Sequence, residues 1–157
     1  MKILIIQQRY GIGDMVIFLP YIHAISKKFK IPVTILAKKS SKAHDIFKYD
    51  NHVEDIIILD EDKDGVRGVF KLSKVLKEKN FDKVFIFNSS LRYNLVAKFS
   101  GIKKIFQYPL FRSKDNIVLS AKIFTENIIG NVVSTEPNLK INKIKDDFDR
   151  TFKHICL

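Results

Sequence analysis

The side chains of this sequence that could do chemistry gather directly after its first near-continuous apolar run, residues 2–6. That run is followed by Arg9, Gly11, Gly13 and Asp14, and then by a second apolar segment with the character of a helix. Glycines let a backbone turn tightly and approach a ligand closely. The carboxylate of Asp14 stands where a helix N-cap is expected. It therefore either caps backbone N–H groups or faces a cleft as a reactive group, and the sequence alone allows both.

Three arginines, Arg9, Arg92 and Arg112, fall in expected loops or helix starts near strand ends, where a planar guanidinium suits phosphate or carboxylate recognition. Overall, 28 Lys and Arg residues against 17 Asp and Glu residues give a net charge of +11. Such an excess suits an anionic partner such as phosphate groups, a membrane surface or nucleic acid. Most of the charge is lysine spread along the chain, which usually marks a solvated face, so the excess alone selects no partner.

The apolar pattern predicts the scaffold that must position these residues. Expected strands lie at residues 2–6, 32–37, 55–59, 81–87 and 104–108, and expected helices follow them after Asp14 and at residues 39–49, 66–76, 88–101 and 116–129. Alternation at this spacing predicts an α/β fold with a Rossmann-like, doubly wound parallel sheet. The first strand reads as buried on both faces, as at the centre of such a sheet. Ligands of these sheets bind at the carboxyl ends of the strands.

The length of 157 residues and a hydrophobic content of 46% suit one compact domain. We expect that domain to span residues 1–135. Residues 136–157 are expected to be a connection and the start of a further domain, because 146–152 reads as a helix and 154–157 as a strand that has just begun. No signal peptide or membrane-spanning run is evident, and the single Cys156 suits a reducing cytosol, so a cytoplasmic protein is expected.

Several familiar sites are disfavoured by the residues present. Residues 60–65 match the first half of a calcium loop, but Lys71 stands where the bidentate glutamate is required. A phosphorylated receiver domain would need acidic metal ligands where residues 7–9 are Gln, Gln and Arg. A dinucleotide-binding turn would need a third glycine where Val16 stands, and no phosphate-binding P-loop motif occurs. The histidines show no metal-ligand spacing.

Two segments together resemble glycosyltransferase family 9, the lipopolysaccharide heptosyltransferases of bacteria. The first is the apolar strand, the loop ending Ile12-Gly13-Asp14, and Pro20 six residues later. The second is Phe81-Asp82-Lys83-Val84, running through Ser89-Ser90 to Arg92, followed by a segment at residues 101–108 that is similar to the family's G-I-x-x-x-I-G-Y. One departure is that the loop before Gly13-Asp14 is one residue longer than is usual in the family.

The resemblance implies the N-terminal, acceptor-binding half of a GT-B enzyme that transfers a sugar with inversion and without a metal. Asp14 would be the catalytic base, while the backbone around Gly11, Ile12 and Gly13 would face the donor phosphates. Acceptor binding would fall to Arg9, Ser89, Ser90 and Arg92. A carboxylate at a helix N-terminus is a weak base for a sugar hydroxyl and would help mainly late in the reaction.

The implied co-substrate is a nucleotide-sugar such as ADP-heptose, with no further cofactor. The implied acceptor is lipopolysaccharide core or a similar glycan, with peripheral contact to the inner membrane and no nucleic acid partner. Without its second half such a chain would be inactive or nearly so, because it would lack most donor contacts. The alternative is a non-enzymatic Rossmann-like module that binds an anionic ligand and in which Asp14 is structural.

Overall fold

The computed structural model describes residues 1–59, 65–109 and 116–140. Several sequence-based expectations lie outside these residues: most of the acidic turn at 60–65, Arg112, the helix at 146–152, the final strand and Cys156. They stay predictions.

Five parallel strands form a single sheet. They are β1 (Ile3–Ile6), β2 (Val33–Lys38), β3 (Val53–Leu59), β4 (Lys83–Ile86) and β5 (Lys104–Gln107), and their order in the sheet is β3-β2-β1-β4-β5. The predicted parallel sheet with the first strand at its centre is therefore confirmed. Strand order reverses at β1, which pairs with β2 on one side and with β4 on the other.

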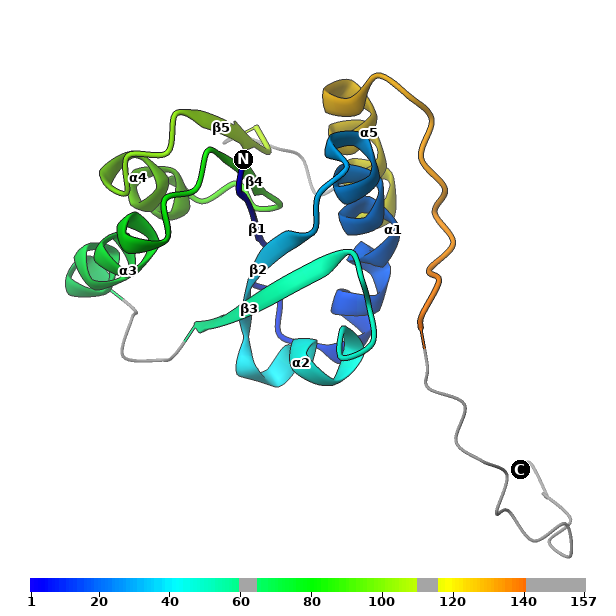
Figure 1. The fold of residues 1–157 in the computed structure, drawn as a ribbon, viewed down its shortest axis with the longest axis horizontal. Helices are drawn as coiled ribbons and strands as arrows, with labels where there is room; N and C mark the ends of the chain where they lie inside the picture. Colours follow the sequence, from blue (N-terminus) through cyan, green and yellow to red (C-terminus); the bar gives the residue numbers. More distant parts are fainter. Residues whose placement is uncertain (60–64, 110–115, 141–157) are drawn as a thin grey trace, which may run out of the picture.

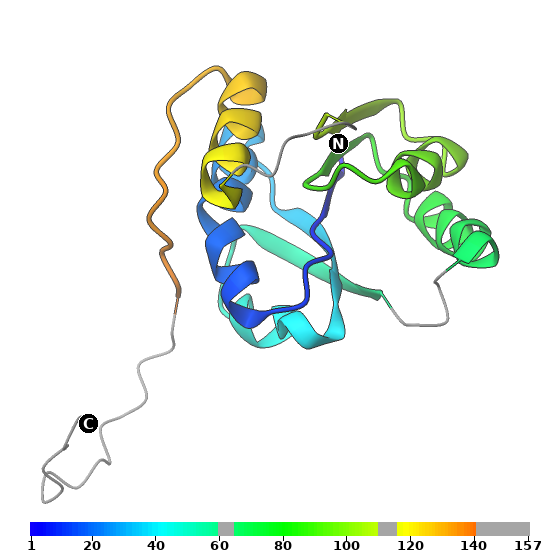
Figure 2. The ribbon, with the colours of Figure 1, turned by 180° about the vertical axis from the view of Figure 1, so that it is seen from behind.

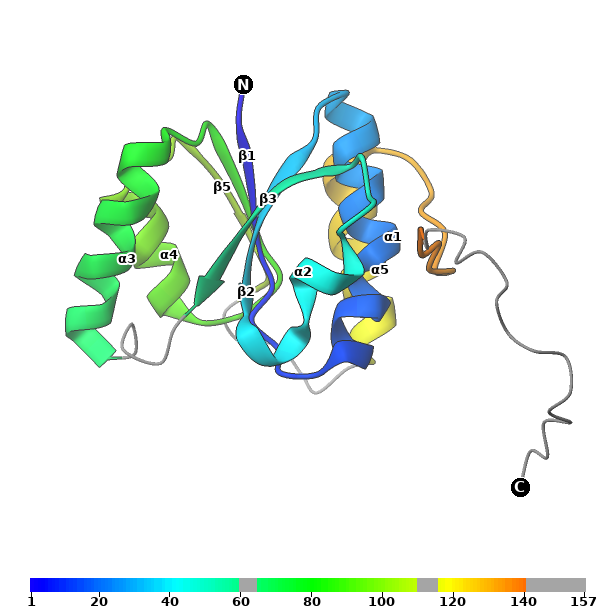
Figure 3. The ribbon, with the colours of Figure 1, turned by 60° about the horizontal axis from the view of Figure 1, so that its bottom comes forward.

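Helices cover both faces of this sheet, as a doubly wound fold requires (Figures 1 and 3). The helices α1 (Ile12–Phe29) and α5 (Ile117–Ile129) pack on one face, and α3 (Gly65–Lys79) and α4 (Leu91–Phe99) pack on the other. The helix expected at residues 39–49 is wrong as a single element. It is split into a 3₁₀ turn, η1 (Lys39–Ser41), and a short α2 (Ala43–Ile46), because Lys42 between them has a left-handed φ of 52°.

Alternate residues of β1 belong to two separate hydrophobic cores, one on each face of the sheet. Ile3 and Ile5 point to the α1 and α5 side, whereas Leu4 and Ile6 point to the α3 and α4 side, and all four are fully buried. Side chains of a strand alternate between the two faces of a sheet, so an unbroken apolar run is what a central strand needs. This burial fixes where β1 ends and its loop begins.

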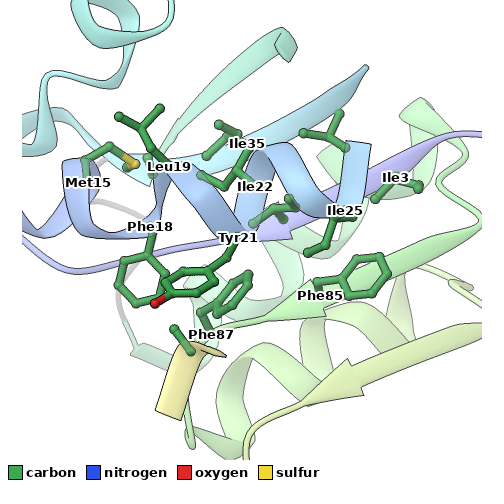
Figure 4. Packing of buried hydrophobic residues seen from close by; sticks show 14 of the residues in the cluster. Ile3, Met15, Phe18, Leu19, Tyr21, Ile22, Ile25, Ile35, Phe85 and Phe87 are labelled. Atoms are coloured by element: carbon green, nitrogen blue, oxygen red, sulfur yellow. The ribbon is translucent and has the colours of Figure 1, made fainter. Parts of the chain in front are cut away.

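Aromatic rings pack among aliphatic side chains in the core under α1 (Figure 4). Phe18 meets Phe87 edge to face at 5.1 Å between ring centroids. Tyr21 is fully buried and its hydroxyl donates to the carbonyl of Val118 at 2.9 Å, which joins α1 to α5; this burial raises the pKa of the Tyr21 hydroxyl. Pro20 lies in the middle of this helix, where it removes one backbone hydrogen bond.

A cluster of polar side chains lies in the C-terminal half of α1, near the amino edge of the sheet. The ring of His23 meets the carboxylate of Asp50 at 2.5 Å, and the Nδ1 of His52 lies 3.1 Å from the hydroxyl of Ser26. Burial and the neighbouring His23 lower the pKa of His52, although Asp50 opposes this. These residues fasten the end of α1 to the start of β3.

After α5 the chain runs beside the helical layer of α1 and α5 as an extended segment without helix or strand, residues 131–140 (Figure 2). The N–H of Val133 donates to the carboxylate of Glu126 at 2.9 Å, which holds the first part of this segment to α5. The domain boundary after residue 135 stays a prediction.

Candidate functional site

Two loops that carry most of the expected site residues meet at the carboxyl edge of the sheet. One joins β1 to α1 and the other joins β4 to α4, and the two strands are neighbours, with Ile6 opposite Ile86 at their ends. This edge lies at the bottom of Figure 3. Ligands of open parallel sheets bind at this edge, most often where the strand order reverses, and here that point is β1.

Asp14 is not the N-cap of α1, as the sequence suggested, but the third residue of its first turn. Gly11 is the N-cap, and its N–H donates to Oδ2 of Asp14 over a long 3.4 Å. The other carboxylate oxygen, Oδ1, lies 3.6 Å from Nη1 of Arg9. The Asp14 side chain remains 29% exposed. It therefore helps to cap the helix and still faces solvent, so the two roles that the sequence left open are compatible in one residue.

The two glycines of this loop do not serve the tight turn that was expected of them. Gly11 has an extended backbone, with φ −92° and ψ 153°, which other residues also adopt. A Cβ on Gly11 would lie 3.3 Å from Oδ2 of Asp14, whereas a Cβ on Gly13 would meet nothing within 4 Å. Gly11 thus leaves room for the carboxylate. Gly13 leaves the first turn of α1 open to a ligand, next to backbone N–H groups that have no partner within the helix.

Two glutamines after β1, which the sequence did not single out as site residues, hold the loop in place. Gln7 is 1% exposed, and its Oε1 accepts a hydrogen bond from the N–H of Arg9 at 2.8 Å. Among the described residues its Nε2 has no hydrogen-bond partner. Oε1 of Gln8 accepts from the hydroxyl of Tyr93 at 2.9 Å, which ties this loop to α4. Two consecutive amides at the end of a buried strand are the signal that could have identified them.

In the second loop, Ser90 is the N-cap of α4 and its Oγ accepts from the N–H of Arg92 at 3.3 Å. The side chain of Asn88 accepts in turn from the N–H of Ser90 at 2.7 Å. Ser89 is half-buried at the same edge. The guanidinium carbon of Arg92 lies 5.7 Å from the centre of the Tyr93 ring. The expected acceptor residues Ser89, Ser90 and Arg92 are thus held side by side at the start of α4.

Gln107, at the end of β5, fixes this second loop and was not expected to do so. Its Nε2 donates to the carbonyls of Asn88 and Ser90 at 3.0 and 2.8 Å, and its Oε1 accepts from Asn94 at 2.7 Å. The sequence offered one signal, a glutamine where the resemblance leads us to expect glycine. Beside Gln107, a hollow of about 330 Å³ runs along α5 past Tyr108 and Phe124.

Positive charge reaches the edge from a third strand as well. Nζ of Lys38, the last residue of β2, lies 3.4 Å from the centre of the exposed Tyr10 ring. The loop after β1 thus carries one cation of its own, Arg9, and is contacted at Tyr10 by a second, Lys38. Lys38 was hidden in the sequence because lysines are spread throughout it.

Within residues 1–59, 65–109 and 116–140, no group of three or more His, Cys, Asp or Glu side chains is arranged to hold a metal ion. In the same part of the chain no helix is both long and apolar enough to cross a bilayer. The assignment of roles to Asp14 and its neighbours, and the absence of a metal from the reaction, stay predictions.

Neither protein-family models nor curated proteins match the sequence, but solved structures match the fold. E. coli ADP-heptose lps heptosyltransferase II matches with a TM-score of 0.64 and 18% identity, over 91% of this chain and 47% of that chain. A glycosyl transferase of family 9 from Veillonella parvula DSM 2008 matches with a TM-score of 0.63 and 16% identity, over 90% and 44%. E. coli heptosyltransferase WaaC with ADP matches with a TM-score of 0.56 and 13% identity, over 81% and 47%.

The chain spans a little under half the length of these solved structures. At identities below 20% the likeness is one of fold. The sequence-based expectation about architecture is therefore confirmed. The chain has a Rossmann-like α/β fold that fits the N-terminal half of a GT-B heptosyltransferase of glycosyltransferase family 9.

Proposed function

We propose that this chain is the acceptor-binding part of an inverting glycosyltransferase that moves heptose or a related sugar from a nucleotide-sugar to a lipopolysaccharide core or similar glycan. The observation that carries the proposal is a part-exposed carboxylate, Asp14, at the carboxyl edge of the central strand in a fold shared with heptosyltransferases. We propose a cytoplasmic location, with the acceptor reached at the inner face of the membrane.

In this proposal Asp14 accepts the proton of the acceptor hydroxyl as that oxygen bonds to the anomeric carbon. The bond from the anomeric carbon to the donor phosphate breaks at the same time, and the electron pair leaves with the nucleoside diphosphate. Attack from the face opposite the leaving group inverts the sugar. The nearby Arg9, with Nη1 at 3.6 Å from Oδ1, helps to hold the carboxylate in place.

The acceptor would be held by Arg9, Ser89, Ser90 and Arg92. A guanidinium binds phosphate or carboxylate oxygens in a bidentate manner, which suits the phosphorylated or acidic sugars of such a core. The hydroxyl of Ser90 already accepts from the Arg92 N–H, but it can still donate its own hydrogen to a ligand. The N–H groups of Ile12 and Gly13 would receive the donor phosphates. Both substrates would then meet at Asp14.

The test is Asp14→Asn in the complete gene product, including any reading frame beyond Leu157. Asparagine keeps the shape and can still accept from the Gly11 N–H, but it cannot take a proton. We expect the rate of transfer from ADP-heptose to fall by roughly 10²–10⁴-fold, as for loss of a general base, with an unchanged circular dichroism spectrum. The matched control is Asp82→Asn, which removes an exposed carboxylate from the amino edge of the sheet. Retained transfer in Asp14→Asn would leave Asp14 as a capping residue and end the assignment of a base.

A further inference from the structure

An exposed apolar stripe runs along α3 and α4, the two helices on the face of the sheet opposite α1 and α5. It consists of Leu91, Leu95 and Phe99 on α4 and Phe70 on α3, which are 62%, 43%, 52% and 61% exposed. Residues four apart lie on one face of a helix, so the three α4 residues form a continuous row. The helices α3 and α4 lie side by side (Figure 1). The rings of Phe70 and Phe99 stack at 5.7 Å with an angle of 14°, which joins the two helices into one surface. We call this surface the α3–α4 stripe.

Lysines border the α3–α4 stripe on both helices. The exposed side chains of Lys71, Lys74 and Lys77 lie on the outer side of α3, and Lys98 lies beside Leu95 and Phe99 on α4. The sequence of the two helices holds five lysines and two arginines against a single acidic residue, Glu78. The positive charge of the chain is spread along the sequence, but on α3 and α4 it is almost unopposed by acidic residues.

Another exposed apolar pair, Leu119 and Ile123 on α5, lacks this surrounding charge. Its helix carries one lysine, Lys122, and one glutamate, Glu126, and these two form an ion pair with each other at 3.8 Å. A surface that is apolar along its middle and cationic along its borders is the pattern of a helix that lies in the interface of an anionic bilayer. The α3–α4 stripe has that pattern and the α5 pair does not.

We infer that the α3–α4 stripe docks the protein on the surface of an anionic phospholipid bilayer. Phe70, Leu91, Leu95 and Phe99 would enter the boundary between headgroups and acyl chains. The lysines would reach the lipid phosphates, where each cation adds to the affinity. Leu91 follows Ser90 directly, so the stripe begins at the candidate site. In the docked state an acceptor anchored in the membrane would meet the residues at the start of α4, and to that extent the inference rests on the proposed function.

The test is sedimentation of the full chain with vesicles made of phosphatidylglycerol and phosphatidylethanolamine at 3:7. The first variant, Leu95→Ser with Phe99→Ser, should lower the partition coefficient at least about tenfold, because two exposed apolar side chains are removed. The second, Lys74→Gln with Lys77→Gln, should lower it roughly 10- to 30-fold. It should also weaken the dependence of binding on salt between about 0.1 and 0.5 M, because screening acts on charge.

Each variant has a matched control that changes the same residue types elsewhere. Leu119→Ser with Ile123→Ser removes two exposed apolar residues from α5, and Lys27→Gln with Lys28→Gln removes two exposed lysines from α1. Both controls should bind vesicles as the unchanged chain does. The inference is overturned if the chain does not bind, if the controls lose as much affinity as the stripe variants, or if the stripe variants change the oligomeric state by light scattering and leave vesicle binding intact. Circular dichroism identifies a variant that has failed to fold. If the variant with Leu95→Ser and Phe99→Ser does not fold, the variant with Lys74→Gln and Lys77→Gln still tests the inference.

The vesicle measurement uses no sugar donor or acceptor, so it succeeds or fails independently of the proposed transfer. In the complete gene product, the stripe variants should retain transfer to a deacylated, water-soluble acceptor and lose it for an acceptor embedded in vesicles. Asp14→Asn should instead keep vesicle binding and lose transfer to both acceptors. A stripe variant that loses transfer to both acceptors would contradict the membrane role.

Discussion

Gly13 is the residue whose replacement should raise the stability of the fold and damage the candidate site. It lies in the first turn of α1 with helical backbone, and an added Cβ would meet no atom within 4 Å. Alanine there loses less conformational entropy on folding than glycine does. We expect Gly13→Ala to raise the free energy of unfolding by about 0.4–1 kcal/mol, which is a rise of roughly 1–4 °C in Tm for a chain of this size.

Gly11→Ala is the matched comparison, because it adds the same methyl group two residues earlier. Its backbone would accept alanine, but the new Cβ would lie 3.3 Å from Oδ2 of Asp14 and alanine is a poor N-cap. We expect the free energy of unfolding to fall by up to about 1 kcal/mol. Urea denaturation of the two variants, followed by circular dichroism, should therefore give changes of opposite sign.

The open space above Gly13 has a second consequence for the affinity for the donor. If the N–H groups of this turn receive the donor phosphates, a methyl group at Gly13 stands in their path. A charge-assisted hydrogen bond lost in this way costs about 1.5–3 kcal/mol, so the affinity of the complete gene product for ADP should fall roughly 10- to 100-fold by calorimetry. A destabilised Gly13→Ala would refute the geometry of the helix start, and an unchanged affinity for ADP would refute the assignment of the phosphates.

Three other predictions concern contacts that hold the site and the core. Gln107→Leu removes three hydrogen bonds and should lower the free energy of unfolding by about 1–3 kcal/mol in urea titrations, and a change below about 0.5 kcal/mol would mean that water replaces the lost amide. Tyr21→Phe removes the hydroxyl that donates to the Val118 carbonyl and should cost about 0.5–1.5 kcal/mol, whereas a neutral effect in thermal unfolding would show that α1 and α5 are held by apolar packing alone. Burial and His23 lower the pKa of His52 below its ordinary 6.5, so protonation favours the unfolded chain; stability should fall as the pH drops below about 6.5, and His52→Gln should flatten that fall between pH 7.5 and 5.5. An equal fall in both proteins would remove His52 as its cause.

The order of strands and helices was predictable because a strand that is buried on both faces requires an unbroken run of apolar residues. Residues 3–6 are apolar without a break, and only a central strand needs both of its faces buried. The start of α1 was predicted three residues late. Asp14 is a good N-cap by residue type, but Gly11 takes that position, because β1 ends at Ile6 and a short loop then brings the chain back over the sheet.

The candidate site was predictable in the residues that carry charge and less so in those that hold them. Arg9, Asp14 and Arg92 stand out as charged residues near strand ends, and the structure has all three at one edge. Gln107 did not stand out, because its three hydrogen bonds join atoms 13 to 19 residues away. A single sequence carries no record of such long-range pairs.

The sequence by itself determined the class of fold, since the spacing of its apolar runs is fixed by the repeat of strand and helix. It also pointed to Arg9, Asp14 and Arg92 as charged residues near strand ends, although not to Lys38. Only the tertiary structure decided that Gly13 is open and Gly11 is crowded, that Gln7 and Gln107 fix the loops, and that lysines on two helices border one apolar stripe. Each of these depends on how separate elements pack against one another. The physical reason is that proximity in a fold is decided by the burial of all the apolar faces at once, whereas local patterns record only the burial of each element.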